Sequence, residues 1–80
     1  MAAYGVETKM STDEAIEAAV KYFGEGGLGL DLVDRDPCCV RFEGGGGHVF
    51  VRANAGERTM LDLETREWDI PVKRFMRKVA

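Results

Sequence analysis

Apart from the methionines, this sequence has three side chains that could bind a soft metal: Cys38, Cys39 and His48. A structural zinc site needs four such ligands, usually arranged as Cys-x-x-Cys pairs. Adjacent cysteines on a strand would point to opposite faces, so one copy of the chain cannot complete the site. A dimer could pool Cys39 and His48 from two copies, although we expect these residues at opposite ends of a hairpin. We therefore expect no metal and no cofactor.

Cys39 is the candidate reactive thiol, because Arg41 and Arg52 are expected beside it and guanidinium charge favours the thiolate. No base is aligned with it, and Glu43 on the same face has the opposite effect. A disulfide between neighbours in sequence would distort a strand, so we expect both cysteines to be reduced. Cys38 is then a small buried apolar residue, and Cys39 faces outward.

The glycine run Gly44, Gly45, Gly46, Gly47 precedes His48 and is the candidate ligand loop. Successive backbone amides can surround an anion, and the imidazole would add a donor. The alternative is a flexible hairpin loop. Four glycines cost more conformational entropy than closure requires, because two residues suffice for a hairpin turn. Contact with a ligand or with another backbone would explain the excess.

A β-hairpin over residues 38–53 positions all of these groups. If the glycines form the loop, the small and apolar residues of both runs share one face, which makes the register self-consistent. The opposite face then carries three cross-strand pairs: Cys39 with Arg52, Arg41 with Phe50, and Glu43 with His48.

Two amphipathic helices flank the predicted strands. Ser11 and Glu14 have the spacing of a capping box, and Gly24 is expected to end the first helix in the left-handed conformation. Asp69 is expected to cap the last helix, with Pro71 tolerated in its first turn. Both helices repeat apolar residues at the i, i+3, i+4, i+7 positions of one face.

Two further alternating runs, over residues 28–34 and 58–66, complete a predicted meander of four sequential strands. Residues 1–10 are either an N-terminal tail or a short edge strand, and residues 11–80 form a single domain. We expect an α+β fold of two layers, with one antiparallel sheet of about four strands and two helices packed on one face, in the order α-β-β-β-β-α.

The composition is that of a small globular protein, with 45% hydrophobic and 31% charged residues and a net charge of −3. Residues 71–80 hold four basic residues and no acidic one. We find no signal-peptide core and no membrane-length apolar run, and we expect a cytoplasmic protein that does not bind membranes. One histidine and no recognisable nucleophile arrangement make an enzyme a poor interpretation.

The uncovered sheet face is the predicted functional surface, because it mixes apolar side chains with paired charges. The predicted interface residues are Phe50, Arg41, Arg52 and Met60, with Phe50 as the anchor. We expect a non-enzymatic binding or assembly module that associates with itself or with a protein partner. A thiol redox or metal-linked function at Cys39 and His48 is one alternative. Nucleic-acid binding is another alternative, but the acidic residues expected on the same face would repel phosphate groups.

Overall fold

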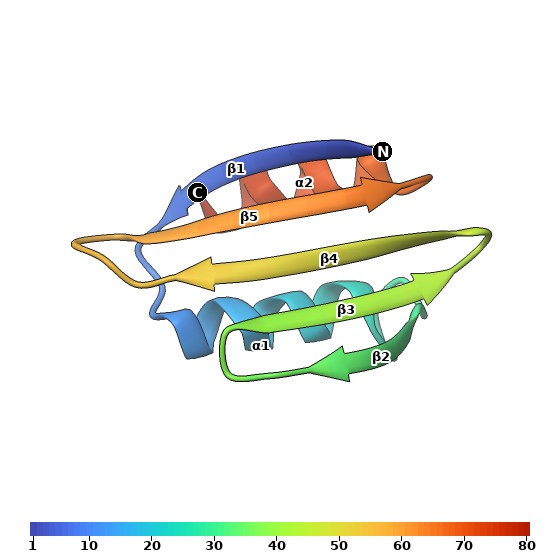
Figure 1. Ribbon diagram of the computed structural model, residues 1–80, viewed down its shortest axis with the longest axis horizontal. Helices are drawn as coiled ribbons and strands as arrows, with labels where there is room; N and C mark the ends of the chain where they lie inside the picture. Colours follow the sequence, from blue (N-terminus) through green and yellow to red (C-terminus); the bar gives the residue numbers. More distant parts are fainter.

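The computed structural model describes residues 1–80 and confirms an α+β fold of two layers (Figure 1). Along the chain the elements are β1 (Ala2–Thr8), α1 (Thr12–Phe23), β2 (Asp31–Arg35), β3 (Cys39–Gly44), β4 (Gly47–Asn54), β5 (Thr59–Arg66) and α2 (Asp69–Val79). All strand pairs are antiparallel, and their order across the sheet is β1-β5-β4-β3-β2.

The sheet has five strands where the sequence predicted about four. Strands β2 to β5 form the predicted meander, and β1 adds to it as an edge strand beside β5. In β1, Tyr4 and Val6 pair with Leu63 and Leu61 and pack against the core, while Thr8 is fully buried. The N-terminal residues are therefore an ordered part of the sheet, and the element order begins with a strand.

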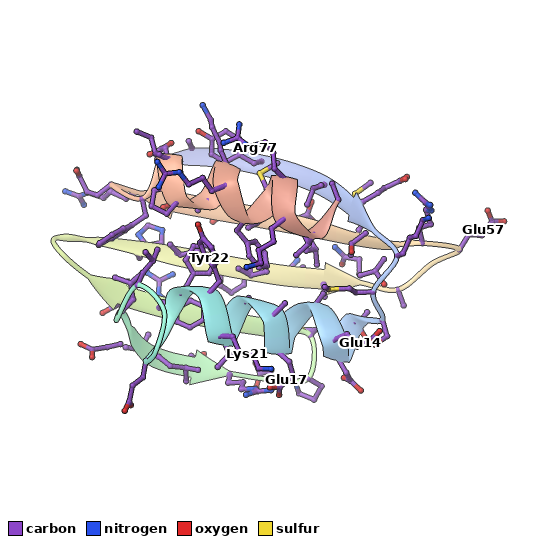
Figure 2. All side chains as sticks on the ribbon, turned by 180° about the vertical axis from the view of Figure 1, so that it is seen from behind. Glu14, Glu17, Lys21, Tyr22, Glu57 and Arg77 are labelled. Atoms are coloured by element: carbon purple, nitrogen blue, oxygen red, sulfur yellow. A yellow bond between two sulfur atoms is a disulfide. The ribbon has the colours of Figure 1, made fainter.

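Both helices lie on one face of the sheet, as predicted (Figure 2). Helix α2 packs on β1 and β5, and α1 packs on β3 and β4. Between the layers, the ring of Phe23 packs against the rings of Phe42 and Phe75, with centroid distances of 5.6 and 5.2 Å. No helix covers the other face (Figure 1), and the side chains that point outward from it, except that of Cys39, are at least partly exposed.

The predicted register of the central hairpin is confirmed, since Val40 pairs with Val51 and Arg41 pairs with Phe50. The turn is shorter than the sequence suggested. Gly44 pairs with Gly47, so that only Gly45 and Gly46 form the loop, with φ angles of 57° and 80°. Two successive positive φ angles are typical of the type I′ turn, which suits the twist of a two-residue hairpin.

Contacts with the rest of the chain explain why glycine is found in and beside this turn. The indole Nε1 of Trp68 donates a hydrogen bond of 2.9 Å to the carbonyl oxygen of Gly44. A Cβ atom at Gly45 would lie 2.8 Å from Cζ2 of Trp68, and one at Gly47 would lie 2.0 Å from the carbonyl oxygen of Arg66. The β3–β4 turn is thus packed against the segment that joins β5 to α2.

The start of α1 is as predicted, because Ser11 and Glu14 form a reciprocal capping box. These hydrogen bonds to Ser11 lower the pKa of Glu14. The predicted helix end is wrong in one respect: Gly24 has a φ of −86°, and the left-handed residues are Gly26 and Gly29 further along the loop.

Asp69 does not cap α2, contrary to the prediction. It is the first helical residue, Trp68 occupies the cap position, and no side chain caps the helix. The Asp69 carboxylate instead accepts a hydrogen bond of 2.7 Å from the hydroxyl of Tyr4. This hydrogen bond joins β1 to α2, two elements that are far apart in the sequence.

Strand β2 is shorter and more exposed than the predicted strand over residues 28–34. Its pairing with β3 shifts between Leu32 and Asp34, which leaves Val33 as the extra residue of a bulge. Leu30 is buried just before the strand, whereas Leu28 lies in the loop and is 41% exposed. Bulges and charged residues are common ways of protecting an edge strand from pairing with another chain.

The turn geometry predicts different costs for two alanine substitutions. Gly47→Ala should lower the free energy of unfolding by about 3 kcal/mol, because its Cβ would overlap the backbone oxygen of Arg66. Gly46→Ala should cost about 1 kcal/mol, because that Cβ meets no atom within 4 Å and only the positive φ is unfavourable. Urea denaturation followed by circular dichroism measures both values. Equal losses would contradict this explanation of the glycines.

The Tyr4–Asp69 contact predicts a pH dependence. Hydrogen bonding to Asp69 is the main cause that raises the pKa of Tyr4 above its usual value of 10.0, with burial and the nearby carboxylate charge adding to it. The neutral phenol makes the bond, so its stabilising contribution is present below pH ~10 and is lost as the pH rises through the raised pKa. Absorbance titration in a Tyr22→Phe background should give a lower Tyr4 pKa after Asp69→Ala. Asp13→Ala is the control and should leave that pKa unchanged.

Candidate interface on the uncovered sheet face

The candidate site is the sheet face opposite the helices, to which every second residue of each strand points. We call it the outer face. In β1, β3, β4 and β5 the pairing places the following residues on it: Ala3, Gly5, Glu7, Cys39, Arg41, Glu43, His48, Phe50, Arg52, Met60, Asp62 and Glu64.

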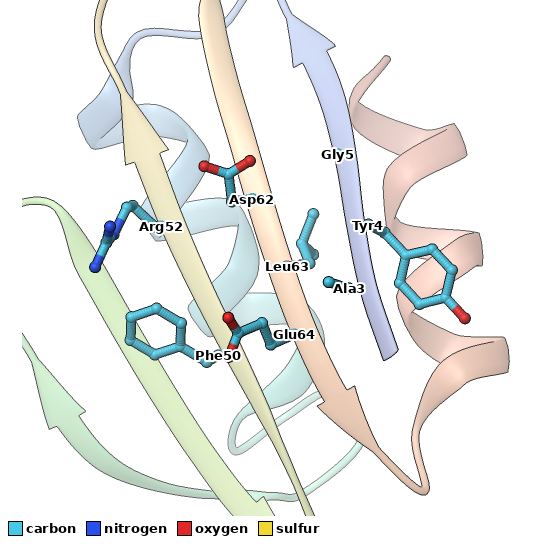
Figure 3. Close-up of a pocket in the computed structure, with 8 residues that line it drawn as sticks. All are labelled: Ala3, Tyr4, Gly5, Phe50, Arg52, Asp62, Leu63 and Glu64. Atoms are coloured by element: carbon cyan, nitrogen blue, oxygen red, sulfur yellow. The ribbon is translucent and has the colours of Figure 1, made fainter. Parts of the chain in front are cut away.

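Phe50 and Arg52 of β4 form the centre of the outer face (Figure 3). The Phe50 ring is half-buried, and Cζ of Arg52 lies 5.9 Å from its centroid. That distance is within the range of a cation–π interaction. Across β4 and β5, Phe50 pairs with Glu64 and Arg52 pairs with Asp62.

The charges at this centre have no ion-pair partners. The three ion pairs of the chain are Arg35–Glu17, Arg41–Glu43 and Arg58–Glu7. Asp62 accepts a hydrogen bond of 2.9 Å from Nδ2 of Asn54, and no cation lies within ion-pairing distance of it. Arg52, Asp62 and Glu64 therefore present opposite charges side by side, each free to bind a group from outside the chain.

A hollow of about 450 Å³ lies beside this centre. It forms because the outward residues of β1 that border it, Ala3 and Gly5, are small, while Phe50 and Arg52 stand on the other side of β5 (Figure 3). Asp62 and Glu64 project from β5, the middle strand of the three. The outer face thus combines a projecting aromatic ring with an adjacent recess bordered by acidic groups.

The four predicted interface residues all lie on the outer face, but they are not equally central. Phe50 and Arg41 are cross-strand partners, and Arg52 lies next to them. Arg41 is also held by Glu43, with 3.3 Å between Nε and Oε2. Met60 is 40% exposed and pairs with Asn54 near the far end of β4, away from the hollow.

Sequence reasoning missed Ala3 and Gly5, because the status of residues 1–10 was left open. The signal that could have found them is the alternation of Tyr4, Val6 and Thr8. If these residues face the core, Ala3 and Gly5 must face outward. Their small size then predicts a recess next to any larger residue of the neighbouring strands.

Cys38 and Cys39 form a disulfide bond, so the prediction that both are reduced is wrong. The predicted burial is also reversed: Cys38 is exposed and Cys39 is buried. With both sulfur atoms bonded, Cys39 is not a reactive thiol in this structure.

The reason lies in where the strand begins. Backbone hydrogen bonds between Asp36 and Cys39 close a tight turn whose two central residues are Pro37 and Cys38. Cys38 therefore lies outside β3, and the bond does not interrupt the pairing of Cys39 with Arg52. A smaller hollow of about 260 Å³ beside the disulfide is also lined by Phe50, Arg41 and Arg52.

The structure does not bring Cys39 and His48 together. Cys39 pairs with Arg52 and His48 pairs with Glu43, so the two lie at opposite ends of the hairpin. No three His, Cys, Asp or Glu side chains are grouped closely enough to hold a metal ion. In the candidate ligand loop, Gly45 packs against Trp68 and Gly47 against the backbone of Arg66, and Gly46 has a positive φ. Of the two predicted explanations for the excess of glycine, close approach of another backbone segment is therefore the one that the structure supplies.

The basic residues at the end of the chain are Lys73, Arg74, Arg77 and Lys78, on exposed positions of α2. Lys73 lies over the ring of Tyr4, with 5.5 Å from Nζ to the centroid. Neither helix combines the length and the apolar character that crossing a membrane would require.

Comparison with known proteins gives no relative: no family model matches the chain, and neither a curated protein nor a solved structure is significantly similar to it.

The disulfide predicts the thiol content of the isolated protein. Protein purified without reductant should have no thiol that reacts with Ellman's reagent under denaturing conditions, whereas reduced protein should have two. In Cys38→Ser the remaining Cys39 should titrate as one thiol and so calibrates the assay. Two thiols in the untreated protein would contradict the bond.

Proposed function

We propose that this protein is a non-enzymatic assembly module that forms a homodimer through its outer face. The observation that carries the proposal is the combination of Phe50, unpaired charges of both signs and a hollow on one uncovered sheet face. A surface that offers both a projection and a recess can complement a second copy of itself. Closed two-fold dimers, in which the same patch is used twice, are the commonest homo-oligomers.

A two-fold axis parallel to the strands, between β4 and β5, relates the two copies in the proposed dimer. It places β4 of each copy over β5 of the other. Because Arg52 and Asp62 are in register within one chain, Arg52 of each copy then faces Asp62 of the other. The same rotation places the Phe50 ring of each copy over Glu64 of the other, which borders the hollow.

The size of the face predicts a weak dimer. The axis overlays four strands of each copy, β1, β5, β4 and β3. Strands about 4.8 Å apart, with about six residues of about 3.4 Å each in contact, give roughly 400 Å² of flat area on each copy. A standard protein interface buries about 800 Å² on each partner. We therefore expect a dissociation constant in the micromolar range, with Phe50 as the main apolar anchor and the charges setting the register.

Charge reversal tests the proposed register. Arg52→Asp and Asp62→Arg should each weaken the dimer by roughly tenfold or more, because like charges then face each other. An equal mixture of the two variants should form heterodimers, since both contacts between the copies again join opposite charges. Sedimentation velocity over a range of protein concentrations measures each state. Within each chain the like-charge pair persists in the mixture, so recovery reports contacts between chains.

Two control variants reverse one charge each at positions outside the outer face. Glu57→Arg lies in the β4–β5 turn and Arg77→Asp lies on α2, and neither should alter the association. Phe50→Ser should abolish the dimer while the chain stays folded by circular dichroism. A wild-type protein that is monomeric up to millimolar concentration, or a mixture that does not recover, would reject the proposal.

Thiol–disulfide chemistry at Cys38 and Cys39 is a second candidate function, favoured by the bond itself and by the exposure of Cys38. It replaces the earlier hypothesis of a centre made by Cys39 and His48. The cytoplasmic location stays a prediction, and the disulfide weighs against it, because such bonds persist mainly in oxidising compartments. We do not propose nucleic-acid binding, because Asp62 and Glu64 adjoin the only aromatic ring of the outer face.

A further inference from the structure

The opposite side of the molecule has a groove between the two helices, separate from the outer face. Its volume is about 490 Å³. Its apolar lining comes from both helices and from the loops beside them: Ala18 and Tyr22 of α1, Phe75 and Val79 of α2, and Met10 and Leu28. The side chain of Tyr22 lies between the helices in Figure 2.

The groove follows from the way the helices sit on the sheet. Helix α1 packs on β3 and β4, whereas α2 packs on β1 and β5, so a seam is left between them. Ala18 is too small to fill it, and Gly26 and Gly27 carry no side chains where they line it. The rings of Tyr22 and Phe75, with centroids 5.5 Å apart, bridge the seam.

The charged residues of the groove are both cationic. Lys21 of α1 and Lys78 of α2 line it from opposite helices, and no acidic residue does. Both lysines are exposed, and neither takes part in an ion pair. Nζ of Lys78 lies 5.9 Å from the centroid of the Tyr22 ring. The groove therefore has an apolar lining with two lysines at its rim, and neither lysine is held by an ion pair within the chain.

We propose that this groove binds a small amphipathic anion, specifically a medium-chain carboxylate, with its apolar tail between the helices and its carboxylate between Lys21 and Lys78. The volume falls within the range of about 300 to 1,000 Å³ that is typical of small-molecule sites. The two cations attract a carboxylate, and the lining buries a tail. The proposal does not depend on dimerisation, since the outer face lies on the other side of the sheet.

Calorimetric titration with decanoate, below its micelle concentration, tests the site. The wild-type protein should bind one decanoate, and Lys21→Gln/Lys78→Gln should bind it at least tenfold more weakly. The control Lys9→Gln/Lys73→Gln removes the same charge outside the groove and should bind as the wild type does. Decanol, which lacks the carboxylate, should also bind at least tenfold more weakly than decanoate.

Amide chemical shifts locate the ligand. Decanoate should shift the signals of Ala18, Tyr22 and Val79 and leave those of Phe50 and Arg52 unchanged. Absence of binding up to millimolar decanoate, equal affinity of the two lysine double variants, or shifts confined to the outer face would each overturn the proposal. So would equal affinity for decanol, because the site would then lack the anion preference on which the inference rests.

Discussion

The packing of Trp68 against the β3–β4 turn is the contact on which the arrangement of the molecule depends. It holds the closed end of the central hairpin against the segment between β5 and α2, through the bond to Gly44 and the close approach to Gly45. A shift of the hairpin by one residue would exchange its two faces, because side chains alternate along a strand. The same contact that fixes the turn therefore keeps Phe50 outside and its neighbours in the core.

One-sided coverage of the sheet gives the protein two unlike surfaces. The helices bury their apolar stripes on one face of the sheet and leave a groove between them. The outer face instead exposes charged side chains and one aromatic ring, that of Phe50. The small residues Ala3, Gly5 and Ala18 create both recesses. Both hollows therefore form where strands and helices carry small residues beside larger ones.

The sequence predicted the parts of the fold that depend on local pattern. The hairpin register and the capping box of α1 involve residues close in sequence, and both are confirmed. Asp69 was assigned to a cap because its partner, Tyr4, is distant in sequence and could not be anticipated. The disulfide was missed because Cys38 was placed in a strand. The recess at Ala3 and Gly5 was missed because a pattern of three alternating residues does not distinguish a strand from a tail.

The position of β1 has a consequence for how the chain folds during synthesis. Its only partner in the sheet is β5, and Ala2 pairs with Thr65. During synthesis β1 must therefore wait until β5 has also left the ribosome before its backbone groups find partners. Contacts between distant segments are slow to form, because a long loop must close first. Strands β2 to β4 and α1 can assemble earlier, so the sheet edge formed by β1 and β5 is expected to be completed late in folding.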